Sequence, residues 1–175
     1  MKVLAFAASS SSKSINKTLA NYAASLVEGA EFEMLDINDY EMPIFSQDRE
    51  EELGQPQQAK DFFAKLGEAD AIIISFAEHN GTYTAAYKNL FDWTSRIDMK
   101  VFQGKPVVYL ATSPGPGGAQ SVLAAATNSA QFFAADVRAS LSIPSFFDNF
   151  DMESQKLINA ELDLALKDAV AKLHD

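Results

Sequence analysis

The sequence contains no cysteine, and it has only two histidines among its 175 residues. The absence of cysteine excludes disulfides, thiolate nucleophiles and most structural zinc sites. The motifs H-E-x-x-H and G-x-S-x-G are also missing, so we expect neither a zinc hydrolase nor a serine hydrolase. No side chain stands out as a catalytic acid, base or nucleophile. Any redox chemistry therefore has to come from a bound cofactor.

Basic residues are few: 14 Lys and Arg stand against 24 Asp and Glu, which gives a formal net charge of -10. A field of this sign repels nucleic-acid backbones and anionic lipid, so we expect neither as a partner. The opening "MKVLAFAASS" turns polar too early for a signal segment or a membrane span. We therefore expect a cytoplasmic protein with one domain over residues 1–175, a length typical of a single hydrophobic core.

Short apolar runs alternate with longer amphipathic segments along the whole chain. The predicted strands are Lys2–Ala7, Glu31–Leu35, Ala71–Phe76, Pro106–Ala111 and Asp136–Leu141. The predicted helices are Ile15–Glu28, Glu50–Leu66, Ala85–Ile97, Ala119–Phe133 and Glu153–Leu173. This alternation predicts an α/β fold with a five-stranded parallel sheet between two layers of helices. In a chain this short it favours the flavodoxin-like three-layer fold with strand order 2-1-3-4-5, in which ligands bind at the carboxyl ends of strands one and three.

The stretch "ASSSSKSIN" lies between the first predicted strand and the first predicted helix. A helix N-terminus offers unpaired N–H groups and the positive end of a dipole, and small hydroxyl residues allow an anion to come close. The glycine motifs of dinucleotide and nucleoside triphosphate sites are absent, which leaves a cradle for a single phosphate, with Lys13 as one cation. The alternative is a helix cap in a solvated serine-rich loop. Asp36 is interpreted as a strand-end aspartate.

The loops after the third and fourth strands are also unusual. In "FAEHNGTYTAAYKNLFDW" the residues Asn80, Gly81, Thr82 and Tyr83 could present donors and acceptors to the edge of a planar heterocycle, or they could form a plain turn. His79 is interpreted as a residue at the rim of the pocket. The loop "ATSPGPGGAQ" combines rigid prolines with glycines that allow close backbone approach.

Three motifs in this order resemble the NAD(P)H-dependent FMN reductase family of flavodoxin-like flavoproteins, which includes quinone, azo and chromate reductases. The first-loop pattern Gly-Ser-x-Arg-x-x-Ser-x-Asn is similar to Ala8, Ser9, Ser11, Ser14 and Asn16. The pattern Pro-Glu-Tyr-Asn-x-Ser-x-Pro is similar to Ala77, Glu78, His79, Asn80, Thr82 and Thr84. Leu-Lys-Asn-x-x-Asp-Trp is similar to Tyr87, Lys88, Asn89, Asp92 and Trp93. A compressed Ser-x-Gly-x-x-Gly-Gly element corresponds to Ser113, Gly115, Gly117 and Gly118.

The chain departs from these patterns at three positions. Ser11 replaces the usual arginine, so one phosphate or NADPH contact is missing, for which Lys13 substitutes in part. Ala77 and His79 replace proline and tyrosine, which changes the rim of the pocket and leaves the substrate preference open.

The resemblance implies a set of FMN-binding residues. Those implied for the phosphate are Ser9, Ser11, Lys13, Ser14, Ile15 and Asn16. Those implied for the isoalloxazine edge are Glu78, His79, Asn80, Gly81 and Thr82, with Ser113, Gly115 and Gly118 closing the other side. The segment Met42–Asp48 resembles a loop that borders the flavin in the family, which implies that Pro43 and Phe45 lie near the ring. A homodimer or tetramer is implied as well.

The function that the resemblance implies is hydride transfer from NADPH or NADH to FMN and on to a small acceptor in a ping-pong scheme. The acceptor could be free flavin, a quinone, an azo compound or a metal oxyanion. One alternative is a flavodoxin-like FMN electron carrier that serves a protein partner, which the acidic composition would suit. A second alternative is a binding module without a cofactor, because a fold alone does not determine a function.

Overall fold

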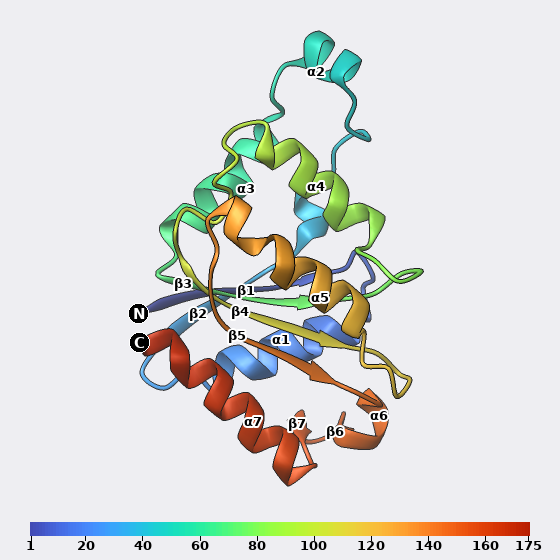
Figure 1. Ribbon diagram of the computed structural model, residues 1–175, viewed down its shortest axis with the longest axis vertical. Coiled ribbons are helices and arrows are strands. Elements are labelled where there is room, and N and C mark those ends of the chain that lie inside the picture. The colour runs from blue at the N-terminus through green and yellow to red at the C-terminus, as the bar shows by residue number, and fades with distance from the viewer.

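The computed structural model describes all 175 residues and contains a five-stranded parallel sheet (Figure 1). The strands are β1 (Lys2–Ala8), β2 (Glu31–Leu35), β3 (Ala71–Phe76), β4 (Pro106–Thr112) and β5 (Asp136–Ile143). Their spatial order is β2-β1-β3-β4-β5, which confirms the order predicted from the sequence. Nearly every residue of β1, β3 and β4 is buried, because these central strands are covered on both faces.

Helices cover both faces of the sheet, each over its own hydrophobic core. On one face lie α1 (Ile15–Ser25) and α7 (Ala160–Ala171); on the other lie α3 (Gln57–Glu68), α4 (Ala85–Ser95) and α5 (Gln120–Ser129) (Figure 1). Side chains alternate along β1, so Leu4 and Phe6 join the α3–α4–α5 core while Val3 and Ala5 join the α1–α7 core. No helix has both the length and the apolar character that are needed to cross a membrane.

The segment predicted as one helix over residues 50–66 forms two helices, which corrects the sequence-based prediction. α2 (Gln47–Leu53) ends at Gly54, whose φ is +69°, and α3 starts after Pro56. A glycine in this conformation ends a helix, and the following proline cannot continue it. α2 buries none of its residues and extends away from the body of the molecule (Figure 1).

The last predicted helix, over residues 153–173, begins later than expected. Residues before it form a small antiparallel hairpin of β6 (Phe150–Asp151) and β7 (Lys156–Leu157), which follows the short helix α6 (Phe146–Asn149). α7 starts only where the Asn159 side chain accepts a hydrogen bond from the N–H of Leu162, at 3.2 Å. Three 3₁₀ helices complete the chain: η1 (Ile37–Tyr40), η2 (Ala130–Phe133) and η3 (Lys172–His174).

A partly buried polar contact joins α1 to α7. The Tyr22 hydroxyl donates a hydrogen bond to the Asp163 carboxylate, which also pairs with Lys167 at 2.6 Å. Burial, with help from Asp163, raises the pKa of Tyr22 to about 12. Burial disfavours the Asp163 carboxylate, but the hydrogen bonds from Lys167 and Tyr22 outweigh it and hold the pKa of Asp163 below its ordinary value of 3.8.

We expect Asp163 to contribute acid-sensitive stability. Because its folded pKa is depressed, its contribution is complete above pH 3.8 and is lost as the pH falls through the lower folded value. Asp163→Asn should reduce the free energy of unfolding at neutral pH by about 1 to 2 kcal/mol. The variant should also lose less stability than the wild type on acidification to about pH 3. Urea unfolding at both pH values measures this, and Asp168→Asn, an exposed position on the same helix, is the control. An acid dependence equal to that of the wild type would contradict the assignment.

Candidate functional site

The carboxyl ends of β1, β3 and β4 meet around a cavity of about 280 Å³, where the strand order predicts a site. From the loop after β1 it is lined by Ser9, Ser11, Lys13, Ser14, Ile15 and Asn16. From the other elements it is lined by Ala77, Glu78, His79, Thr112, Ser113, Pro114 and Phe147. The structure therefore brings together nine of the fourteen predicted site residues, while Asn80, Gly81, Thr82, Gly115 and Gly118 lie outside the lining.

The loop after β1 presents hydrogen-bond donors that have no acceptor within the chain. They include the backbone N–H groups of Ser12, Lys13, Ile15 and Asn16. The buried hydroxyls of Ser9 and Ser14 accept hydrogen bonds from the chain but donate none, so their hydrogens are available as well.

The donors of this loop suit an anion. They surround the N-terminus of α1, where the helix dipole also favours negative charge. Lys13 is the one lysine or arginine in the cavity lining. A donor set of this kind fits a phosphate group.

The Asn16 side chain holds the elements of the site together. It is only 3% exposed, and its Nδ2 donates to the carbonyl of Thr112 at 3.2 Å. Its Oδ1 accepts from the Ser75 hydroxyl at 2.7 Å and from the Thr112 N–H at 3.1 Å. The carboxamide oxygen and one Nδ2 hydrogen are thus used by β3 and β4. The backbone N–H of Asn16 makes no hydrogen bond within the chain and remains for a ligand.

The turn after β3 is a tight reversal beside the cavity. Asn80 and Gly81 have φ values of +52° and +79°, which is the combination found in two-residue hairpin turns of the Asn-Gly type. His79 and Thr82 exchange backbone hydrogen bonds of 3.0 and 3.3 Å across the turn. The Thr82 N–H is therefore taken, and the backbone donors left for a ligand are the N–H groups of Asn80 and Gly81.

Glu78 lines the cavity, but its carboxylate already has a partner. It accepts a hydrogen bond of 2.8 Å from the N–H of Val122 in the first turn of α5. This helix has no side-chain cap of its own, so Glu78 satisfies one of its unpaired donors and complements its dipole. Glu78 thus fixes α5 beside the cavity, a role that the sequence pattern did not predict.

The glycine-rich loop after β4 is shaped by contacts with the end of β5. The Ser113 hydroxyl donates to the carbonyl of Gly115 at 3.1 Å, and the same carbonyl accepts from the Ser145 N–H at 2.9 Å. Gly118 has a φ of +60°, and a Cβ there would lie 2.2 Å from the Ser142 hydroxyl oxygen. Gly118 is therefore required by close packing against β5.

Three lining residues were not predicted from the sequence: Thr112, Pro114 and Phe147. Phe147 lies on α6 and is 58% exposed, so a large apolar ring borders the cavity from outside. The apolar run "FFDNF" after the last predicted strand was the available signal.

The segment Met42–Asp48 is fixed by α4 and does not line the cavity. The Asn89 side chain donates to the carbonyls of Met42 and Pro43, each at 3.1 Å, and accepts from the Phe45 N–H at 2.8 Å. The Trp93 indole donates to the Pro43 carbonyl at 2.7 Å and packs edge-on against the Phe45 ring at 5.0 Å. The Lys-Asn-x-x-Asp-Trp pattern thus positions this loop in the present chain.

Asp36 is held at the end of β2, consistent with its interpretation as a strand-end residue. The Lys17 ammonium lies 2.9 Å from its carboxylate, and the hydrogen bond from Lys17, followed by that from the Asn38 N–H, holds the pKa of Asp36 below its ordinary value. Asn38 in turn donates to the carbonyl of Ser10 at 3.1 Å. No group of three or more His, Asp or Glu side chains is placed to bind a metal ion.

The comparisons with known proteins give a consistent set of relatives. The family model described as NADPH-dependent FMN reductase matches residues 1–148. A 2-hydroxy-1,4-benzoquinone reductase from a Burkholderia species is 35% identical over 107 residues, which are 60% of this chain and 56% of that protein. An NAD(P)H-dependent FMN reductase from Pseudomonas aeruginosa is 33% identical over 119 residues, 67% of this chain and 63% of that protein. The chain thus spans less than two thirds of the length of either relative.

The fold is also found in solved structures. A flavoenzyme NAD(P)H:(acceptor) oxidoreductase from Paracoccus denitrificans superposes with a TM-score of 0.77 at 23% identity, covering 99% of this chain and 95% of that one. An azoreductase from Bacillus anthracis gives a TM-score of 0.66 at 16% identity and covers 99% of this chain and 98% of that one. At these identities the likeness establishes the shared fold.

We expect Asn16→Ala to destabilise the whole site. The substitution leaves the Ser75 hydroxyl and both backbone groups of Thr112 buried without this partner, which should reduce the free energy of unfolding by about 2 to 4 kcal/mol. Asn38→Ala is the control, because Asn38 also forms a hydrogen bond with the loop after β1 but is exposed. It should reduce the free energy of unfolding by less than about 1 kcal/mol. Urea unfolding of both variants measures the difference, and equal losses would show that the Asn16 contacts are not central.

Proposed function

The chain belongs to the NADPH-dependent FMN reductase family, and from this premise we propose that it is an FMN-dependent oxidoreductase. It would use NADPH or NADH to reduce a small acceptor. The observation that carries the proposal is the cluster of unpaired donors around the N-terminus of α1, at the carboxyl edge of the sheet. This donor set fits the phosphate of FMN in chemistry and in its place in the fold.

The phosphate would be held mainly by backbone groups. We assign it to the N–H groups of Ser12, Lys13, Ile15 and Asn16, supplemented by the hydroxyls of Ser9 and Ser14. Ser11 stands where the family pattern has arginine, and Lys13 supplies a positive charge two residues away. Because the donors are fixed before binding, the loop does not need to reorganise around the anion.

The ring would lie between the loops after β3 and β4. Bound FMN would supply the redox chemistry, namely hydride transfer from NAD(P)H and reduction of the second substrate. The protein's part is to bind and orient: the free N–H groups of Asn80 and Gly81 would meet one edge of the ring, and Ser113, Pro114 and Phe147 would border the other side. Glu78 is bound to α5 and would not serve as an acid or base, so none is assigned.

The acceptor would be a small molecule that enters the same cleft in a ping-pong scheme. Free flavin, a quinone, an azo compound and a metal oxyanion are all compatible with an open cavity. A quinone is favoured, because relatives from Burkholderia, Arabidopsis thaliana and Escherichia coli are named as quinone reductases or oxidoreductases.

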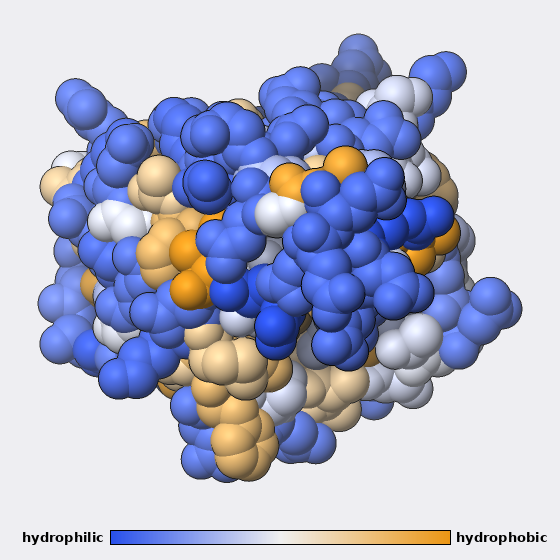
Figure 2. Space-filling model, turned by 90° about the horizontal axis from the view of Figure 1, so that it is seen from above, coloured by the Kyte–Doolittle hydropathy of each residue, from blue (hydrophilic) through white to orange (hydrophobic).

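We further propose that residues 1–175 act as one domain that assembles into a homodimer or tetramer. α2 and the segment before it project from the body, and both Ile44 and Leu53 are more than half exposed. The face seen from the α2 side is otherwise mostly hydrophilic, with apolar residues gathered in small separate patches (Figure 2). A projecting helix that buries none of its residues in its own subunit is better explained by contact with a second copy.

The reaction can be tested by following flavin absorbance under anaerobic conditions. The protein is loaded with FMN, and NADPH or NADH is added, followed by a benzoquinone. Bleaching by a nucleotide and return of the absorbance with the quinone would establish a reductase and identify its preferred donor. FMN binding without bleaching by either nucleotide would favour the electron carrier, and failure to bind FMN would overturn the proposal.

The phosphate cradle makes a separate prediction about affinity. FMN should bind about 100-fold more tightly than riboflavin, which lacks the phosphate, and Ser14→Ala should narrow this ratio by about three- to tenfold. Ser46→Ala is the matched control, because Ser46 caps α2 as Ser14 caps α1 but lies away from the cavity. Titrations that follow flavin fluorescence measure the ratio of FMN affinity to riboflavin affinity in the wild type and in each variant. An unchanged ratio for Ser14→Ala, or an equal change for Ser46→Ala, would remove Ser14 from the cradle.

A further inference from the structure

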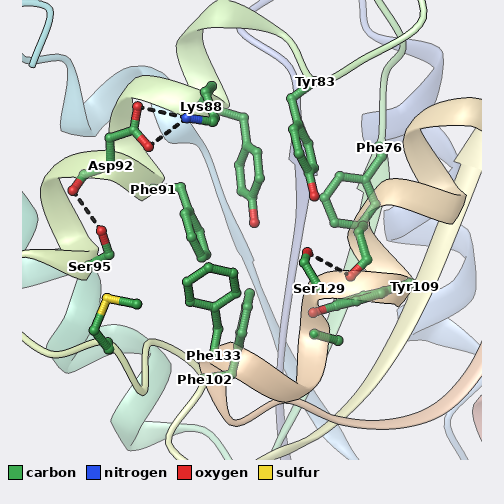
Figure 3. Close-up of a pocket in the computed structure, with 14 residues that line it drawn as sticks. Phe76, Tyr83, Lys88, Phe91, Asp92, Ser95, Phe102, Tyr109, Ser129 and Phe133 are labelled. Atoms are coloured by element: carbon green, nitrogen blue, oxygen red, sulfur yellow. Dashed lines mark hydrogen bonds and ion pairs between the residues drawn. The ribbon is translucent and has the colours of Figure 1, made fainter.

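A second cavity of about 380 Å³ lies between α4 and α5, on the α3–α4–α5 side of the sheet (Figure 3). It shares no lining residue with the cavity at the carboxyl edge. Its walls are mainly aromatic and comprise Phe76, Tyr83, Tyr87, Phe91, Phe102, Tyr109 and Phe133. Its volume falls in the range of small-molecule sites, whereas well-packed cores contain few voids larger than a water molecule.

Two phenol groups in this cavity are buried without a partner. Tyr87 is 4% exposed and Tyr109 is 1% exposed, and neither hydroxyl makes a hydrogen bond within the chain. No fully enclosed side-chain oxygen or nitrogen in the protein lacks a partner, so these hydroxyls are reached from the cavity. Figure 3 shows the hydroxyls of Tyr83 and Tyr109 directed into the space between the two helices.

Only groups that enter the cavity can form hydrogen bonds with these hydroxyls, because the chain itself offers them no partner. Phenylalanine would pack in the same place without a polar group to satisfy. Burial raises the pKa of both Tyr87 and Tyr109, so both remain neutral donors at physiological pH. The cavity therefore offers hydrogen-bond donors on apolar walls.

The charges near the cavity cancel each other. Lys88 lies 2.7 and 3.0 Å from the two carboxylate oxygens of Asp92, one turn along α4, and no other charged side chain lines the space. A charged ligand would lose its hydration without gaining an unpaired partner. The lining thus selects against ions.

The arrangement of the rings favours a flat ligand. Phe91 and Phe133 meet edge to face at 4.6 Å, and Phe76 and Tyr109 do so at 5.2 Å. Such walls present both ring faces and ring edges, against which a further aromatic ring packs well.

We propose that this cavity is a second ligand site, which takes a neutral, flat compound of one or two rings carrying an oxygen that accepts hydrogen bonds from Tyr87 and Tyr109. The site is independent of the proposed cofactor cradle, because the two cavities share no residue. Its occupation requires no FMN.

The probe for this site is 2-naphthol, with the anion 2-naphthoate as the charged comparison. Isothermal titration should show one 2-naphthol per chain with a dissociation constant of about 10 µM to 1 mM, equal in FMN-free and FMN-saturated protein. 2-Naphthoate should bind at least about tenfold more weakly. Absence of 2-naphthol binding, or its displacement by FMN, would overturn the proposal.

Two tyrosine variants locate the binding. Tyr87→Phe and Tyr109→Phe should each weaken 2-naphthol about three- to tenfold, while the unfolding temperature stays the same or rises because no hydrogen bond within the chain is lost. Tyr40→Phe is the matched control: this ring packs edge-on against Phe62 at 5.5 Å, outside the cavity, and its loss of a hydroxyl should not change the affinity. Affinity that is unaffected in the Tyr87→Phe, Tyr109→Phe double variant would show that the probe binds elsewhere.

Discussion

The buried Asn16 carboxamide holds the first turn of α1 against the ends of β3 and β4, and the geometry of the carboxyl edge depends on this contact. One side chain accepts from Ser75 and from the Thr112 backbone and donates back to Thr112. Thr112 also links this contact to β5, because its hydroxyl donates to the Ile143 carbonyl at the end of that strand, at 2.7 Å. On the opposite face of the sheet from α1, the Thr84 hydroxyl caps α4 and donates to the Ala8 carbonyl. Together these contacts fix the N-termini of two helices at the point where the strands end.

Other polar side chains of the motifs, like that of Asn16, bond to the protein itself. Glu78 caps α5 and Asn89 holds the loop before α2, so side chains that look suited to a ligand serve the structure instead. What they leave exposed is backbone: the N–H groups of the serine loop and of the turn after β3. A backbone donor has a direction set by the fold and no rotamer freedom to lose, so a site built from such groups is rigid before the ligand arrives. This explains why residue type alone is a poor guide to which atoms face the cavity.

The strands and their order could be predicted from the sequence because buried parallel strands appear as continuous apolar runs, and five runs separated by helices leave few topologies. The stretch from residue 47 to 68 was harder, because the break at Gly54 and Pro56 interrupts a pattern that otherwise reads as one helix. The C-terminal hairpin has strands of only two residues, too short for any periodicity to show. The location of the site could be predicted from the strand order. The hydrogen-bond partners of Asn16 could not, because they lie 59 and 96 residues away in the sequence and depend on tertiary packing. The position of Phe147 also depends on tertiary packing, because this residue follows β5 in the chain and meets the cavity only in the folded structure.

An acidic protein that offers an anion site needs local forces that exceed its overall field. The formal net charge of -10 is a sum over the whole chain, and salt screens exposed charges from one another beyond about 10 Å. The α1 N-terminus acts at contact distance, where unpaired N–H groups and the helix dipole point at the same small space. Lys17 is neutralised by Asp36, so Lys13 is the one lysine beside the cavity without a carboxylate partner. The fit of this loop to a phosphate therefore rests on backbone geometry, which does not depend on the side chain of Ser11.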